Sequence, residues 1–228
     1  MKNILIIVVL LIIIGAGAWY FLFQETSDIS LDGNTAGVNT GEPVAVVNGE
    51  EVSGQALAAL ETQIATSQGQ TVASLDSEAR AQLQTQAMDA LIGQVLLRQK
   101  VQSSGITITQ EKLASEMELI RARFATEEEY QATLSAEGLD EEGLQTRIGL
   151  ELITQSYLEQ ELGLNSVTAS EAEVQEAYTQ IDAQGQELPA LEEIRADLET
   201  FVIQQKQQAL LDAHIQELRA DADVEILI

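Results

Sequence analysis

The sequence predicts a mainly α-helical domain that a small β pairing closes, with a transmembrane helix in front of it. Three observations predict this fold class. Residues 1–23 contain a long apolar stretch, the body repeats helical apolar spacing between helix caps, and short β-branched strands lie at its two ends. We therefore expect a transmembrane signal-anchor at 1–23, a flexible linker at 24–43 and one helical domain at 44–228.

The apolar stretch Ile4–Phe23 has the length of a membrane-spanning helix. It holds about 20 residues, which span roughly 30 Å as a helix. Lys2 precedes it and no Lys or Arg follows until Arg80, so the positive-inside rule places the N-terminus in the cytoplasm and the domain outside. Aromatic residues that favour the membrane interface end the stretch: Trp19, Tyr20, Phe21 and Phe23.

A cleavable signal peptide is the alternative interpretation of this segment. The small residues Ala16-Gly17-Ala18 are similar to a cleavage site, although cleavage there would leave an aromatic cluster exposed. The domain is exported on either interpretation. The following residues, 24–43, are rich in Gly, Thr, Asn and acidic residues without periodicity, which predicts a flexible tether.

Composition excludes several classes of function. The chain has 228 residues, with 37 acidic and 11 basic side chains and a net charge of −26. A surface this negative repels phosphate backbones, so we expect no nucleic-acid binding. The sequence has no Cys, which excludes disulfides and thiolate chemistry, and aromatic residues make up 4% of it.

Caps and apolar spacing predict the helices of the body. Ser53 and Thr109 are good N-caps, Thr126 with Glu129 and Ser170 with Glu173 form capping boxes, and Gly105 suits the position after a helix end. In the helix expected at 76–103, apolar residues at spacing four form two neighbouring ridges that predict a wide buried face. The expected helices are about 53–67, 76–103, from 109, from 126, 140–162, 170–178 and 189–220.

The two short strands predict how the body closes. Residues 44–48 precede an Asn-Gly turn, and residues 224–228 read VEILI after two aspartates. Each strand alone would leave its backbone polar groups unpaired. We therefore expect 44–48 to pair with 224–228.

The order of these motifs resembles a known family. The stretches VAVVNGEEVSGQAL, LIGQVLLRQKVQSSGITIT and VTASEAEVQEAYTQ, all within residues 44–180, are similar to the N-terminal chaperone domain of the SurA, PpiD and PrsA family. The closing HIQELRADADVEILI is similar to the family segment that returns to complete this domain. The resemblance implies an exported folding factor that binds unfolded or newly translocated proteins.

One departure from the family concerns catalysis. Members of the family usually carry parvulin prolyl-isomerase domains after the EVQEAYTQ helix, and these use a pair of His residues. Here a short segment separates that helix from the closing one, and His214 is the one histidine of the chain. We therefore expect no enzyme activity, and we interpret His214 as a surface or edge residue.

We expect no catalytic, cofactor-binding or metal-binding residues. The residues that would form a client-binding cradle, by the resemblance, are Met117, Phe124, Tyr130 and Tyr157. Each can instead fill the core, because sequence does not separate a buried stripe from a client-facing one.

The resulting functional expectation is a membrane-tethered, ATP-independent holdase. It would lie on the extracytoplasmic or periplasmic side of the bacterial cytoplasmic membrane and bind unfolded or translocating envelope polypeptides. The translocation machinery is a further candidate partner. Two alternatives stay open: a non-catalytic scaffold for one dedicated partner at the membrane, and a residual isomerase role by family analogy.

Overall fold

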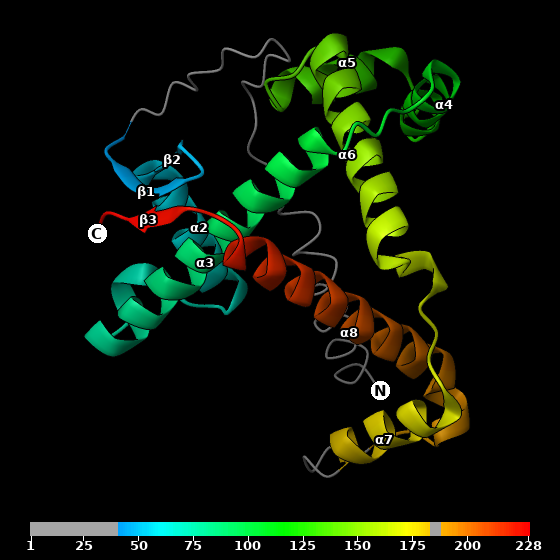
Figure 1. The fold of residues 1–228 in the computed structure, drawn as a ribbon. Coiled ribbons are helices and arrows are strands. Elements are labelled where there is room, and N and C mark those ends of the chain that lie inside the picture. The colour runs from blue at the N-terminus through cyan, green and yellow to red at the C-terminus, as the bar shows by residue number, and fades with distance from the viewer. Residues whose placement is uncertain (1–40, 183–187) are drawn as a thin grey trace. The chain divides into compact units, whose positions relative to one another are not determined.

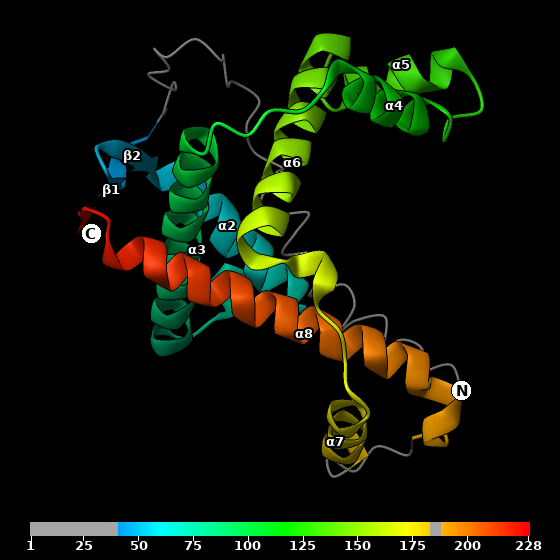
Figure 2. The same ribbon diagram turned by 45° about the vertical axis from the view of Figure 1, so that its right-hand side comes forward.

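A computed structural model describes residues 41–182 and 188–228, and in these ranges the chain is mainly helical with one small sheet (Figures 1 and 2). Single-turn 3-10 helices occupy Val72–Ser74 and Leu164–Ser166. The strands are β1 (Pro43–Val47), β2 (Glu50–Ser53) and β3 (Val224–Ile226). The helices are α2 (Gly54–Ser67), α3 (Ser77–Ser103), α4 (Gln110–Arg121), α5 (Glu127–Ala136), α6 (Glu141–Leu162), α7 (Glu171–Asp182) and α8 (Leu191–Ala220).

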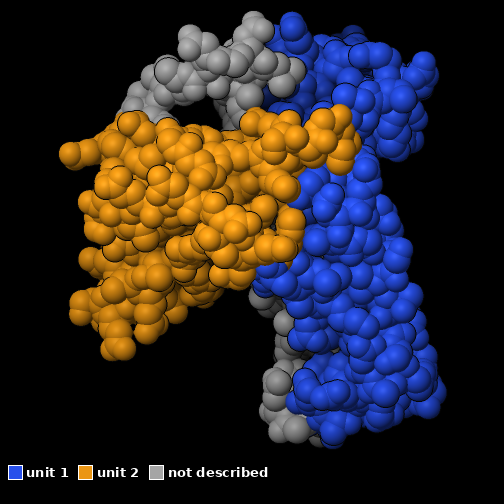
Figure 3. Space-filling view, in the orientation of Figure 1, with its two compact units in different colours: residues 1–26, 107–213 blue, residues 27–106, 214–228 orange. Residues whose placement is uncertain are grey.

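The described residues form two compact units (Figure 3). Residues 107–182 and 188–213 belong to unit 1, and residues 41–106 and 214–228 belong to unit 2, so helix α8 contributes to both. Among the described helices, none combines the length and apolar character that a membrane crossing needs. The predicted membrane segment 1–23 and most of the predicted linker 24–43 lie outside the described residues, and the single domain at 44–228 stays a prediction.

The sheet of unit 2 confirms the pairing expected between the two ends of the body. Its strand order is β2-β1-β3, and both pairs are antiparallel. Ala45 pairs with Ile226 and Val47 with Val224. The strand β2 is not predicted by the sequence, because the stretch EEVS lacks the apolar alternation that is typical of strands.

The Asn-Gly turn joins β1 and β2. Asn48 and Gly49 have φ of 51° and 86°, which suits the tight hairpin turns that Asn-Gly favours. The Asn48 amide N–H donates to the Asp223 carbonyl at 2.7 Å, and its side-chain Oδ1 accepts from the Asp223 N–H at 2.9 Å. The turn therefore links the first hairpin to the end of the body.

Helix α3 supplies much of the core of unit 2. The two predicted ridges are buried, as their spacing required: Leu83, Ala87, Leu91 and Val95, with Met88, Ile92 and Leu96. A Cβ at Gly93 would meet Ile215 Cγ2 at 3.0 Å, so this glycine permits a close approach between α3 and the end of α8. Arg219 of α8 pairs with Asp89 of α3 at 2.6 Å.

Two separate apolar clusters lie in the described part of unit 1. Helices α4, α5 and α6 surround Tyr130, Leu134 and Leu144. Helices α7 and α8 pack around a second cluster, whose buried members are Val174, Ala177, Leu198 and Val202. The capping predictions hold in this unit, because Thr109, Thr126 and Ser170 each accept a bond from the backbone N–H three residues later. Asp140 caps the predicted helix that follows it in the same way.

The polar middle of α8 has a structural role. Lys206 Nζ donates to the Thr168 carbonyl at 2.8 Å and pairs with Glu173 at 2.7 Å. Gln207 Nε2 donates to the Leu164 carbonyl at 2.8 Å. These side chains satisfy carbonyls of the segment between α6 and α7, which explains why the polar stretch QQKQQ interrupts the apolar face of α8.

The interpretation of His214 as a surface residue was wrong. The residue is 8% exposed. It lies three positions after Leu211 and four before Leu218, so it shares their inward face of α8. Its Nδ1 lies 3.9 Å from a Glu217 carboxylate oxygen.

Candidate polypeptide-binding surfaces

All four predicted client-contact residues lie in unit 1, and three of them gather in one apolar cluster. Met117 and Phe124 are half-buried and pack against the cluster around Tyr130. Tyr130 and Tyr157 are each 1% exposed. Tyr157 lies further along α6 and is not part of that cluster. Met117 and Phe124 therefore keep part of their surface open to solvent, while Tyr130 and Tyr157 are core residues.

Tyr130 joins three helices through its ring and its hydroxyl. The Phe124 ring meets it edge-on at a centroid distance of 5.4 Å, and the Arg121 guanidinium lies over its face at 4.8 Å. The hydroxyl donates to Glu141 Oε2 at 3.0 Å, and Arg121 contacts the same carboxylate at 3.2 Å. Burial, and then the bond to Glu141, raise the pKa of Tyr130. Tyr130 of α5 therefore contacts both α4 and α6 and stabilises the packing of the three helices.

The membrane-interface residues predicted at the N-terminus are outside the described residues. Trp19, Tyr20, Phe21 and Phe23 therefore have no assigned position. Their role at a membrane interface stays a prediction.

The large apolar side chains that reach solvent are unevenly distributed. In unit 1, Leu119 is 56% exposed on α4 and Leu210 is 39% exposed on α8, each as a single side chain. Isolated exposed leucines are ordinary in soluble domains. In unit 2, by contrast, three consecutive residues are exposed: Ile226 at 50%, Leu227 at 45% and Ile228 at 64%. Within the described part of the chain, this is the one contiguous run of large exposed apolar residues.

This run lies on the β3 edge, by which we mean the outer side of β3 together with residues 226–228. Since the strand order is β2-β1-β3, β3 is an edge strand, drawn in red beside β1 in Figure 1. A hollow of about 710 Å³ lies beside residues 227 and 228. Its other lining residues are Gly41, Glu42, Pro43, Val44, Gly54 and Gln55. The sequence predicts a strand at 224–228 but does not indicate that one side of this strand stays open.

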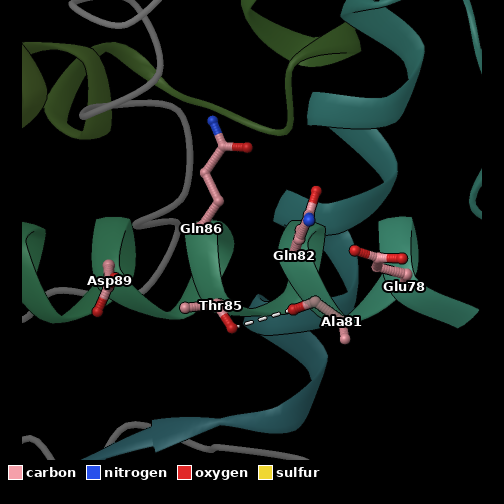
Figure 4. Close-up of a pocket in the computed structure, with 6 residues that line it drawn as sticks. All are labelled: Glu78, Ala81, Gln82, Thr85, Gln86 and Asp89. Atoms are coloured by element: carbon pink, nitrogen blue, oxygen red, sulfur yellow. Dashed lines mark hydrogen bonds between the residues drawn. The ribbon is translucent and has the colours of Figure 1, made fainter.

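A second hollow, of about 600 Å³, follows the outer face of α3. The residues that line it are Glu78, Ala81, Gln82, Thr85, Gln86 and Asp89 (Figure 4). Thr85 Oγ1 donates to the Ala81 carbonyl at 3.0 Å, a bond within the helix. The side chains are those of an ordinary solvated helix face. In the described ranges, no group of His, Asp and Glu side chains has an arrangement that would hold a metal ion.

The described fold is that of a mainly helical domain with one small three-stranded sheet. Residues 1–158 match the SurA-like N-terminal domain, and the chain belongs to this family. The match confirms the resemblance found in the sequence, and it suggests a chaperone-type protein. A search of curated proteins finds no match. The SurA-like N-terminal domain is the domain found in the chain, without a parvulin match.

Proposed function

We propose that this protein is a membrane-tethered, extracytoplasmic, ATP-independent holdase for unfolded or newly translocated envelope proteins. The observation that carries the proposal is a contiguous exposed apolar run, residues 226–228, on a domain of the SurA-like N-terminal family. Apolar contacts of this kind are non-directional, so they accept many sequences. Release needs no nucleotide, because each contact is weak.

The exposed surfaces suggest which residues touch a client. We assign direct contact to Ile226, Leu227 and Ile228, and to the exposed edges of Met117 and Phe124. Tyr130 and Tyr157 act indirectly, because side chains that are 1% exposed hold helices in place rather than meeting a client. The net charge of −26 supports solubility of the loaded complex.

The tether is a separate part of the proposal. Residues 1–23 anchor the chain in the cytoplasmic membrane and residues 24–43 link the anchor to the body, which lies outside the cytoplasm. Protease added to spheroplasts should digest the body while leaving a membrane-bound fragment. Digestion only after lysis of the membrane would contradict this orientation.

A light-scattering assay tests the holdase activity. The full chain in lipid nanodiscs is mixed with a chemically unfolded outer-membrane barrel protein as the client, with empty nanodiscs as control. We expect suppression of aggregation near an equimolar ratio without ATP. No suppression by a chain shown to be folded would overturn the proposal.

Selectivity separates this proposal from a dedicated scaffold at the membrane. A holdase protects several unrelated unfolded clients, whereas a scaffold binds one folded partner and protects none. A proline-limited refolding assay addresses the remaining alternative, and we expect no acceleration of refolding.

A further inference from the structure

We propose that the β3 edge binds an extended client segment as an additional strand, and that it selects apolar segments flanked by Lys or Arg. This inference deepens the proposed function and rests on it. It assigns a binding mode and a preferred substrate class to one surface of unit 2.

The register of the sheet determines which backbone groups of β3 are available. The Asp223 carbonyl accepts from Asn48, and the Leu227 N–H donates to the Val44 carbonyl at 2.9 Å. Backbone groups alternate in an antiparallel ladder, so residues 223, 225 and 227 bond to β1. The N–H and C=O groups of Val224 and Ile226 therefore point to the open side of the strand.

The side chains at this edge suit an apolar partner. Ile226, half exposed, lies opposite the fully buried Ala45, so it stands on the core-facing side of the sheet. A strand added beside it would cover the exposed area of Ile226 and Ile228. The hollow beside residues 227 and 228 has room for a side chain at one end of the added segment. Main-chain bonds then give affinity without strict sequence requirements.

The charges around the strand indicate the flanking residues of that segment. Asp221, Asp223 and Glu225 lie within five positions, and none of them pairs with a Lys or Arg in the described part of the chain. Glu42 adds a carboxylate beside residues 227 and 228, where it lines the hollow. A client segment with Lys or Arg beside its apolar core would form ion pairs with these carboxylates.

The same charges disfavour a second copy of this chain as the occupant. Antiparallel pairing of two β3 strands through a twofold axis at their middle would place the two Glu225 carboxylates opposite each other. Like charges directly opposite are destabilising in a sheet, and two chains of charge −26 repel each other. The acidic residues therefore protect an open edge from self-association while admitting basic clients.

Amide hydrogen exchange of the full chain in nanodiscs tests the binding mode directly. The probe is a short peptide with alternating Val and Thr flanked by Lys pairs, and its matched control carries Glu in place of Lys. We expect the Lys peptide to slow exchange at Val224 and Ile226, while Glu225 and Leu227, already bonded to β1, change little. Binding without slower exchange at Val224 and Ile226 would overturn the proposal. Protection that rises with protein concentration alone would also overturn it, because the occupant would be a second copy.

Two variants test the backbone and charge components by fluorescence anisotropy. Ile226→Pro removes an outward N–H and leaves the bonds to β1, and we expect about fivefold weaker binding than in the Ile226→Val control. Asp221→Lys with Glu225→Lys should reverse the preference in favour of the Glu peptide. An unchanged preference would contradict the charge argument, and the exchange experiment on the unmodified chain stands if a variant fails to fold.

The outcomes distinguish this inference from the proposed function. If Ile226→Pro suppresses client aggregation as well as the unmodified chain does, strand addition at the β3 edge is wrong, while apolar contact of clients with residues 226–228, and with it the holdase proposal, stands. If the Lys peptide protects Val224 and Ile226 but the chain suppresses no aggregation, the binding mode stands and the holdase proposal fails.

Discussion

At the scale of single residues, Asn48 connects three segments that are far apart in the sequence. Its backbone and side chain bond to Asp223, and its Nδ2 donates to Gln99 Oε1 at 2.8 Å. Gln99 in turn donates to the Val47 carbonyl at 3.2 Å. The φ of 51° at Asn48 is one that Asn tolerates better than most residues.

Replacing Asn48 should destabilise unit 2. Asn48→Ala removes the side-chain bonds and places Ala at positive φ, so we expect the free energy of unfolding to fall by about 2 kcal/mol in urea denaturation. Asn48→Gly loses the same side-chain bonds without the backbone strain and should cost less. Equal free energies of unfolding for the unmodified chain and Asn48→Ala would show that the bonds of Asn48 to Asp223 and Gln99 do not stabilise unit 2.

Glu173 should make unit 1 sensitive to acid. Hydrogen bonds from Lys206, and then from Ser170, lower the pKa of Glu173 from its ordinary 4.5 to about 2. A carboxyl whose pKa is lower in the folded state contributes stability above pH 4.5, and this contribution is lost as pH falls toward 2. Urea denaturation across this range should show a smaller acid-induced loss for Glu173→Gln than for the unmodified chain. The same dependence of the free energy of unfolding on pH in both chains would contradict a stabilising ion pair between Glu173 and Lys206.

At the scale of elements, Gly93 sets the approach of α3 to the end of α8. Gly93→Ala gains helix propensity but brings a methyl group to 3.0 Å from Ile215 Cγ2. We expect little net change in the unmodified chain and a gain of about 1 kcal/mol in an Ile215→Ala background, where the space is open. Urea denaturation of the unmodified chain, the two single variants and the double variant measures this coupling. If Gly93→Ala changes the free energy of unfolding equally with Ile215 in place and in the Ile215→Ala background, the close contact is contradicted.

The Tyr130 hydroxyl gives a second prediction at this scale. Tyr130→Phe keeps the ring against Phe124 and Arg121 but removes the bond to Glu141. We expect a loss of about 1 kcal/mol in the free energy of unfolding. Tyr130→Ala should cost about 3–5 kcal/mol, because it also leaves a cavity in the cluster. Similar losses for both variants would mean that the ring packing contributes little.

The helices were predictable from the sequence because their signals are local. Ser53, Thr109, Thr126, Asp140 and Ser170 cap helices where their side chains indicated. The burial of His214 was missed although its spacing to Leu211 and Leu218 is local, because a polar imidazole is usually expected at the edge of an apolar face. The contacts of Lys206 and Gln207 were also hidden, since they join α8 to carbonyls some forty positions earlier.

At the scale of the whole molecule, the pairing of β1 with β3 was predictable because lone strands need partners. The candidate site was harder to predict from the sequence. The predicted residues Tyr130 and Tyr157 are core residues, while the exposed run 226–228 depends on the strand order β2-β1-β3. An apolar strand reads the same in sequence whether its outer side is covered or open.

The central claim is that the chain holds clients in an unfolded state. Hydrogen exchange of a barrel client, recorded in its soluble complex with the full chain and no ATP, tests this most directly. The holdase account predicts a soluble complex in which most client amides exchange as fast as in the unfolded client. Native-like protection of the client within the complex would contradict this account and would favour a scaffold for a folded partner.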